Sequence, residues 1–383
     1  MIFRLVAKER WGMLEVNRIH CMDCLEGMKQ LADNSADCCV TDPPYGQRFM
    51  GKVWDSQIPS IEVWREVRRV LKPGAHLLAA CGTRTQHRMA VNIEDAGFEI
   101  REIVCWHYGQ GFPKSLDIGK AIDKEAGATR ISPGPITENA KKWDGWGTAL
   151  KPATEFWTLA RKPIEEKTIA QNVLKYGTGG LNIDACRIPG GDAQGGEYTV
   201  KRLKPGATLN KTGGVWRLAE KDAQLYWGVM KAGRFPANLI LDEFMAAEMD
   251  GQTGILESGK PMGIRKAQNK IFGQYAPGQE VTGYGDSGGA SRFFYVAKAD
   301  AEERGSGNDH STVKPLTLMQ YLIKLVCPIE PGRIVLEPFA GSGSTCIAAR
   351  LLGIDFMAFE LDARHVAIAE QRLRNELGLF YET

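Results

Sequence analysis

The sequence predicts an α/β protein built on a mostly parallel sheet and interrupted by a long insertion. Short apolar runs alternate with amphipathic segments before about Pro113 and again after about Arg292. This alternation is typical of parallel strands covered by helices. Between the two regions, glycine, proline and tryptophan increase and regular periodicity fades. A chain of 383 residues suits one large domain with an insertion, so we divide it into residues 1–163, 164–290 and 291–383.

The first region predicts strands and helices in alternation. The expected strands are 18–20, 37–41, 76–81 and a further strand ending at Trp106, and the expected helices run from about Leu25 to Leu31, from Ile61 to Leu71 and before the last of these strands. Apolar residues in the helices recur every three or four positions, which places them on one face. Lys72-Pro73-Gly74 then stops the second helix, and the polar segment 47–60 is expected to be a mobile loop.

The last region repeats this pattern. The expected strands are 293–297, 333–337 and 356–360, and the expected helices begin near Pro315, Thr345 and Ala363. Proline is favoured at a helix start because it needs no hydrogen-bond partner for its nitrogen. The final helix is expected to run to about Leu377.

Composition excludes several classes of protein. The 25% charged and 43% hydrophobic residues are those of a globular protein, and no run of about 18 apolar residues predicts a membrane span. Lys8, Glu9 and Arg10 interrupt any apolar N-terminal stretch, so we expect no signal peptide. Nine cysteines, several within apolar strands, favour a reducing cytoplasm. Cys21 and Cys24 form a lone pair without further ligands at zinc spacing, so no metal is expected.

A Gly-rich turn follows the strand that ends at Glu337. The nicotinamide dinucleotide fingerprint needs a third glycine or alanine where Cys346 stands, so it fails, and the Gly-Lys-Ser/Thr of a Walker phosphate loop is absent. Glu360 ends the next strand, where an acid can accept hydrogen bonds from ribose hydroxyls. The turn therefore predicts a nucleoside-type pocket, although a purely structural turn between strand and helix remains the alternative.

Asp42-Pro43-Pro44-Tyr45 follows another buried strand. Two prolines fix the backbone, so a carboxylate and a carbonyl can point the same way, and the tyrosine adds a flat ring. Such a group can bind an amino group while stacking on its ring. A Pro-Pro turn with a buried tyrosine is the structural alternative. His310-Ser311-Thr312-Val313-Lys314-Pro315, ahead of a helix, could cap a pocket.

These three segments, in this order, resemble the amino-methylating DNA methyltransferases. The target-base tetrapeptide precedes a long variable region and the cofactor glycines come last, which is similar to the β arrangement of that family. The resemblance covers roughly residues 14 to 163 and 291 to 377, and in detail it is greatest to enzymes of phages, prophages and orphan bacterial loci. It implies a Rossmann-like S-adenosylmethionine-dependent methyltransferase fold with circularly permuted motif order and an inserted target-recognition region at 164–290, between the two parts of the catalytic domain.

The resemblance also implies the site residues. Those expected to act on the target base are Asp42, Pro43, Pro44 and Tyr45. Those expected to bind S-adenosylmethionine are Asp23, Asp42, Lys314, Pro315, Glu337, Phe339, Ala340, Gly341, Ser342, Gly343, Ser344, Thr345 and Glu360. Glu337 departs from the family, which usually has aspartate there, and the extra methylene is expected to alter how the methionine end of the cofactor is held.

The implied activity is site-specific methylation of the N6 amino group of adenine in double-stranded DNA after base flipping, with S-adenosylhomocysteine as product and no metal. Cytosine N4 is the alternative target, and a catalytically idle DNA-binding regulator with the same fold is an alternative of a different class. Protein-glutamine and RNA amino methyltransferases usually have the glycines first, so motif order disfavours them. The expected location is the bacterial cytoplasm or nucleoid, or the host cytoplasm for a phage protein.

The insertion is expected to select the DNA sequence. Residues 201–234 hold eight basic and two acidic residues, a net charge of +6, although the whole chain carries only +2. Such a basic, aromatic-bearing segment is typical of a nucleic-acid surface, and a solvated loop region is the alternative. The residues expected to contact DNA are Lys201, Arg202, Lys204, Arg217 and Arg234.

The resemblance also implies a homodimer, because enzymes with this motif order often form two-fold dimers. The helices near Ile61 and Leu318 carry more apolar residues than one narrow buried stripe requires, so part of their surface could pair with a second copy, and burial of both helices against the sheet is the alternative. A cognate restriction endonuclease is not predictable.

Overall fold

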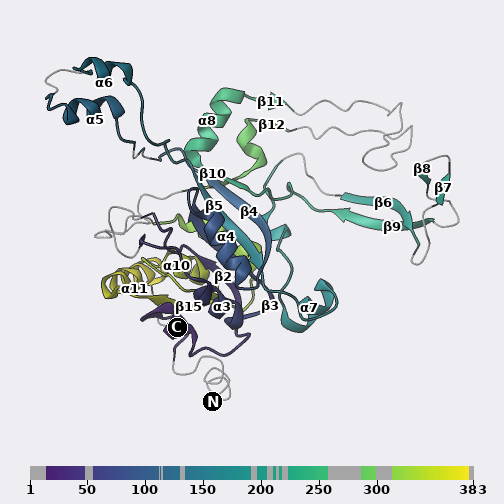
Figure 1. Ribbon diagram of the computed structural model, residues 1–383. Coiled ribbons are helices and arrows are strands. Elements are labelled where there is room, and N and C mark those ends of the chain that lie inside the picture. The colour runs from purple at the N-terminus through teal and green to yellow at the C-terminus, as the bar shows by residue number, and fades with distance from the viewer. Residues whose placement is uncertain are drawn as a thin grey trace.

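The computed structural model places a nine-stranded sheet at the centre of the molecule (Figure 1). It describes residues 14–47, 55–111, 113, 115–129, 134–190, 196–204, 210–212, 215–217, 223–257, 286–298 and 313–378. The strand order is β1-β15-β14-β2-β3-β5-β4-β10-β13. The strands of this sheet are β1 (Ile19–Cys21), β2 (Ala36–Thr41), β3 (Leu71–Gly82), β4 (Glu99–His107), β5 (Thr154–Arg161), β10 (Leu239–Asp242), β13 (Tyr295–Ala297), β14 (Ile334–Glu337) and β15 (Asp355–Glu360). The sheet confirms the expected α/β, Rossmann-like fold.

Of these nine strands, only β5 runs antiparallel to its neighbours, which are β3 and β4. The other neighbouring pairs are parallel. Because β5 is reversed, its first residues lie at the sheet edge where β3 and β4 end: Glu155 pairs with Gly82 on one side and Trp106 on the other. This reversal brings Glu155 to the edge that binds ligands in α/β sheets.

Helices cover both faces of the sheet. The helices of the structure are α2 (Cys24–Met28), α3 (Ile61–Val70), α4 (Gln86–Asp95), α5 (Ile118–Glu125), α6 (Glu138–Lys142), α7 (Ile169–Tyr176), α8 (Glu243–Thr253), α9 (Leu316–Val326), α10 (Ser344–Leu351) and α11 (Ala363–Leu377), with short 3-10 turns at Asp184–Cys186 and Ala290–Phe293. Strand residues alternate between two cores: Cys38 and Val40 face the α9–α11 side, and Cys39 faces the α2–α4 side. Both faces of a parallel strand are thus buried, as its continuous apolar sequence requires.

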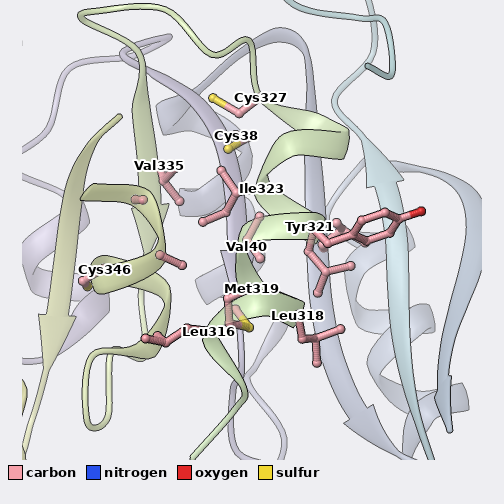
Figure 2. Close-up of a cluster of buried hydrophobic side chains, with 14 of the residues drawn as sticks. Cys38, Val40, Leu316, Leu318, Met319, Tyr321, Ile323, Cys327, Val335 and Cys346 are labelled. Carbon is pink, nitrogen blue, oxygen red and sulfur yellow. The ribbon is translucent and has the colours of Figure 1, made fainter. Parts of the chain in front are cut away.

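Helix α9 is buried on nearly every side. Its side chains Met319 and Ile323 face Val40 of β2 and Val335 of β14 (Figure 2). The helix also packs on α10 and on the 3-10 turn at Asp184–Cys186, and eight of its eleven residues are buried. The excess apolar residues near Leu318 are therefore explained by packing within one chain, and the surface argument for a dimer from this helix is wrong.

The insertion is only partly separate from the sheet. Strand β10 lies within residues 164–290, yet it pairs with β4 and β13 in the central sheet. The remaining strands, β6 (Gly196–Leu203), β7 (Asn210–Thr212), β8 (Val215–Arg217), β9 (Ala223–Met230), β11 (Leu256–Glu257) and β12 (Ser287–Gly288), form three two-stranded sheets. Figure 1 shows the β6–β9 hairpin and, separately, the α5–α6 segment extending away from the central sheet. Among the described residues, no helix is long and apolar enough to cross a membrane.

Most predicted elements occur at or near their expected positions. The last predicted helix matches α11, whereas the predicted strand 293–297 is shorter, because a 3-10 turn occupies Ala290–Phe293. Residues 48–54 of the expected loop and residues 299–312, which include His310, Ser311 and Thr312, lie outside the described residues.

Candidate active site

A cavity of about 1570 Å³ opens at the carboxyl edge of the sheet. Its wall contains residues that end or follow five strands: Asp42, Gly82, Tyr108, Glu337 and Glu360. Parallel strands place their carboxyl ends at one edge, so segments from both halves of the chain meet there. The tetrapeptide and the Gly-rich turn, about 300 residues apart in sequence, therefore line one cavity.

The Gly-rich turn is closed by Glu360. One carboxylate oxygen of Glu360 accepts a hydrogen bond from the Gly341 nitrogen at 2.8 Å, and the other accepts from the Asp362 nitrogen at 2.9 Å. Gly341 and Gly343 have φ angles of +52° and +84°, which favour glycine. The acid at the end of β15 thus fixes the turn that precedes α10.

The two glycines have different surroundings. Gly341 lines the cavity, whereas a Cβ on Gly343 would lie 2.9 Å from the Ala369 Cβ of α11. Gly343 therefore permits close packing between the turn and α11, and it does not line the cavity.

Arg372 of α11 supports the same turn. Its buried guanidinium donates hydrogen bonds to the Ser342 carbonyl at 2.6 Å and to the hydroxyls of Ser342 and Ser344, both at 3.2 Å. Arg372 is not among the site residues predicted from the sequence, because it lies within an amphipathic helix among other charged residues. The only sign of its role in the sequence is a basic residue on the mainly apolar face of α11.

Glu337 joins the two motifs. Its carboxylate accepts hydrogen bonds from the Thr41 hydroxyl, from the Thr345 hydroxyl at 2.5 Å and from the Phe339 nitrogen at 2.9 Å. Burial raises the pKa of Glu337 to about 7, against the opposing effect of these donors. The longer side chain thus links the end of β2 to the Gly-rich turn.

Asp42 is held on both sides. The Tyr45 hydroxyl donates to its Oδ1 at 2.7 Å, and the Lys314 ammonium lies 2.5 Å from its Oδ2. The Tyr45 backbone is fixed in turn: its nitrogen donates to the buried Asp55 carboxylate at 2.7 Å, and its carbonyl accepts from the Thr85 hydroxyl at 2.6 Å. Burial, followed by the Asp42 charge, raises the pKa of Tyr45 well above its ordinary value, so the phenol stays protonated and donates to Asp42.

Lys314 lies between two carboxylates. Its side chain is 5% exposed, and its Nζ lies 3.4 Å from Glu155 Oε2 in addition to its contact with Asp42. Burial alone lowers the pKa of Lys314, but the charges of Asp42 and Glu155 outweigh this effect and raise it. Burial raises the pKa of Glu155. Glu155 is not among the site residues predicted from the sequence, where the only sign of its role is an acid at the start of an apolar strand.

The remaining predicted residues divide between the cavity wall and the core. Asp23 is exposed at the cavity and caps α2, where its carboxylate accepts hydrogen bonds from the nitrogens of Leu25 and Glu26 at 2.9 and 3.2 Å. Pro315 precedes α9 and is buried away from the cavity lining. The predicted residues that line the cavity are Asp23, Asp42, Pro43, Pro44, Tyr45, Lys314, Glu337, Phe339, Ala340, Gly341, Ser342, Ser344, Thr345 and Glu360.

The predicted DNA-contacting residues lie outside this cavity. Lys204 is exposed at the end of β6. Lys201 and Arg202 lie on β6 and Arg217 lies on β8, and their side chains are outside the described residues.

Arg234 differs from this prediction. Its guanidinium pairs with the buried Asp286, donates to the Arg292 carbonyl at 2.8 Å and lies 4.8 Å from the centre of the Phe293 ring. With a side chain only 12% exposed, Arg234 is held against the 3-10 turn at Ala290–Phe293 and does not lie open on the surface as a phosphate contact would.

Within the described part of the chain, no group of three or more His, Cys, Asp or Glu residues could hold a metal ion. The cavity instead combines a carboxylate beside two prolines and an aromatic ring with a Gly-rich turn closed by an acid. These two parts can bind an amino group and a nucleoside, respectively.

Comparison with known proteins shows to which protein family the chain belongs. Residues 36–371 match the DNA methylase family N6_N4_Mtase, and the chain belongs to this family of N6-adenine and N4-cytosine DNA methyltransferases.

The individual relatives share low sequence identity with this chain or match only a short part of it. The Type II methyltransferase M.HindIII of Haemophilus influenzae is 23% identical over 316 residues, which are 82% of this chain and 68% of that protein. The putative methylase YubD of Escherichia coli K12 is 46% identical over 69 residues, 18% of this chain and 30% of that protein. Among solved structures, a putative DNA modification methylase from Thermus thermophilus is 17% identical, with 95% of this chain and 97% of that one covered and a TM-score of 0.42.

Proposed function

We propose that this protein transfers a methyl group from S-adenosylmethionine to the N6 amino group of adenine in double-stranded DNA. One observation carries the proposal: Asp42, with its two prolines and tyrosine, opens onto the same cavity as the Gly-rich turn and Glu360. A base and a nucleoside cofactor held in these two parts would be neighbours, as direct group transfer requires.

The cavity residues fit S-adenosylmethionine. The volume of about 1570 Å³ exceeds the ~300–1,000 Å³ usual for a single small ligand, so it leaves room for a target base beside the cofactor. Glu360 supplies acceptors for ribose hydroxyls, Gly341 permits close approach of the backbone, and Phe339 offers an aromatic ring to the methionine end. The cofactor supplies a methyl group on a positively charged sulfur.

Asp42 is the catalytic residue in this proposal. The exocyclic nitrogen of adenine is a poor nucleophile because its lone pair is delocalised into the ring. The Asp42 carboxylate and the Pro43 carbonyl accept hydrogen bonds from the two amino hydrogens, which favours a pyramidal nitrogen. A carboxylate positioned before reaction also stabilises the positive charge that develops on nitrogen, and it accepts the proton released afterwards.

Tyr45 holds the flipped base. An adenine stacked within a duplex cannot reach a cavity at the sheet edge, so it must leave the helix. The hydrogen bond from the Tyr45 hydroxyl to Asp42 fixes the phenol ring beside the catalytic carboxylate. A base stacked on this ring would present its amino group to Asp42.

Adenine is favoured over cytosine by the Asp-Pro-Pro-Tyr form of the tetrapeptide. Transfer of tritium from labelled S-adenosylmethionine to plasmid DNA, followed by digestion to nucleosides, tests both claims. We expect label in N6-methyladenine. Label in N4-methylcytosine would establish the alternative base, and no transfer to any DNA would favour an idle DNA-binding regulator.

A further inference from the structure

Two carboxylates and one ammonium group meet in the cavity wall. Asp42, Lys314 and Glu155, here termed the carboxylate–lysine triad, come from three segments: the end of β2, the residues before α9, and the start of the reversed strand β5. With all three groups ionised, the triad carries a net charge of −1. The proposed mechanism assigns a role to Asp42 and leaves Glu155 without one.

The Glu155 carboxylate is partly unsatisfied. Its side chain is 14% exposed, its buried Oε2 atom makes no hydrogen bond of ordinary geometry among the described residues, and Lys314 and the Tyr45 hydroxyl are the neighbouring donors that favour its charged form. The same oxygen lies 3.4 Å from Lys314 Nζ, which is close enough for charge attraction but longer than an ordinary charge-assisted hydrogen bond. A buried acid whose only cationic neighbour in the described part of the chain is also paired with another carboxylate is costly, so this position calls for an explanation beyond packing.

The contact between Lys314 and Asp42 suggests what Glu155 does. Its Nζ lies 2.5 Å from Asp42 Oδ2, while the Tyr45 hydroxyl donates to Asp42 Oδ1, so both oxygens of the catalytic carboxylate already have donors. A cation this close neutralises Asp42 at the point where positive charge develops on the target nitrogen. Without Glu155, the Asp42–Lys314 pair would be neutral and would stabilise that charge poorly.

We propose that Glu155 is a positioning residue that shares the Lys314 ammonium with Asp42, keeps the cavity net negative, and draws the ammonium from Asp42 when the target amino group binds. This inference rests on the proposed methyl transfer. The lysine then orders the Asp42 carboxylate without cancelling its charge.

The surroundings of Glu155 make its ionisation sensitive to pH. The titratable groups that act on it or respond to its charge are Asp42, Tyr45, Cys81, Tyr108 and Lys314. Burial raises the pKa of Glu155, and Lys314 opposes that rise. Activity should therefore fall on the acidic side as Glu155 takes up a proton and the triad becomes neutral.

The first test is Glu155→Gln, which keeps the shape of the side chain and removes its charge. We expect kcat for DNA methylation to fall roughly tenfold or more and the acidic limb of the kcat–pH profile to flatten. The conservative variant Glu155→Asp should recover part of the lost rate. The matched control is Glu99→Gln: Glu99 pairs with Arg161 at the opposite end of β5, outside the cavity, and its loss should leave kcat and the pH profile unchanged.

A double-mutant cycle with Lys314→Met tests whether Glu155 acts through the lysine. The triad is neutral in Glu155→Gln but keeps a charge of −1 in the double variant. Glu155→Gln should therefore cost much less in the Lys314→Met background than in the wild-type background. An equal cost in both backgrounds, or a Glu155→Gln enzyme with wild-type kcat and pH profile, would overturn the proposal.

A binding measurement separates this inference from the proposed function. S-adenosylmethionine is cationic at sulfur and S-adenosylhomocysteine is neutral there, so the ratio of their affinities reports the charge of the cavity. Calorimetry should show that Glu155→Gln lowers the affinity for S-adenosylmethionine, relative to that for S-adenosylhomocysteine, by roughly threefold or more. The relative affinity should not change in Glu99→Gln. An unchanged ratio would count against Glu155, whereas wild-type protein that binds both ligands and methylates no DNA would refute only the proposed function.

Discussion

Asp42 owes its proposed chemistry to the groups that surround it. Tyr45 and Lys314 bind its two oxygens, while Asp55 and Thr85 fix the backbone of the tyrosine. Each contact restricts the orientation of one carboxylate before any substrate binds. Preorganisation of this kind accounts for a large share of electrostatic catalysis.

Replacement of Asp42 should therefore abolish turnover before it affects cofactor binding. We expect Asp42→Ala to lose methyl transfer by roughly 10²-fold or more, while affinity for S-adenosylmethionine, measured by calorimetry, is at least partly retained. Asp33→Ala is the control, because Asp33 pairs with Arg69 on the surface. Near-normal turnover in Asp42→Ala would show that another group binds the target amine.

Glu337 predicts a dependence of stability on pH. Its folded pKa of about 7 lies above the ordinary 4.5, so the folded state binds this proton more tightly than the unfolded state. The stability contributed by Glu337 is therefore complete below about pH 4.5 and is lost as pH rises to about 7, by about 3 kcal/mol at most.

Glu337→Gln should remove the loss of stability that ionisation of Glu337 causes as pH rises. We expect the Tm of the variant, relative to that of the wild-type protein, to rise between pH 5 and pH 8, as followed by circular dichroism. A Tm difference that stays constant over this range would show that Glu337 is already ionised at pH 5.

Among the secondary-structure elements, α11 and the Gly-rich turn act as one unit. Gly343 allows the turn to approach Ala369, and Arg372 binds Ser342 and Ser344 across the same contact. The turn before α10 thus takes its shape from a helix that lies 20 to 30 residues later in the chain.

Loss of Arg372 should loosen this turn. We expect Arg372→Met to weaken binding of S-adenosylmethionine by roughly tenfold, since three hydrogen bonds to the turn disappear. Arg374→Met is the matched control: Arg374 belongs to the same helix and pairs with Glu370 at the surface. Equal affinities of the two variants in calorimetry would contradict a role for Arg372 in shaping the pocket.

For the whole molecule, we predict that the β6–β9 hairpin of the insertion contacts DNA. Strand β6 extends with β9 away from the sheet and carries Lys201 and Arg202, followed by Lys204 (Figure 1). We expect neutralisation of these three residues to weaken binding to specific and random duplexes alike, and to flatten the dependence of affinity on salt. Fluorescence anisotropy at several salt concentrations provides the measurement. An unchanged salt slope would show that this strand faces away from DNA.

The homodimer also stays a prediction at this scale. Two-fold dimers are the commonest oligomers, and a dimer would let one copy hold DNA while the other transfers the methyl group. We expect light scattering of the DNA-free protein at micromolar concentration to give about twice the chain mass of 42.2 kDa. A single-chain mass, with DNA also bound by one copy, would rule the dimer out.

The α/β class, most strands and helices, and the two motifs of the candidate site could be predicted from the order of residues. These features depend on local properties: buried parallel strands read as continuous apolar runs, and glycines and prolines mark the turns. Asp42, Gly341 and Glu360 could therefore be located from the order of residues alone, because Asp42 directly follows such a strand, Glu360 ends one, and Gly341 lies in the Gly-rich turn after another.

The folded structure shows how distant residues pair. It assigned β10 to the central sheet, placed Glu155 opposite Lys314, joined Arg372 to the Gly-rich turn, and paired Arg234 with Asp286. The neighbours of a charged residue in the sequence do not tell whether its side chain contacts solvent, DNA or a buried partner, because such a partner lies tens or hundreds of residues away. Burial and long-range pairing arise only when the sheet closes, and they set the charge and geometry of the site.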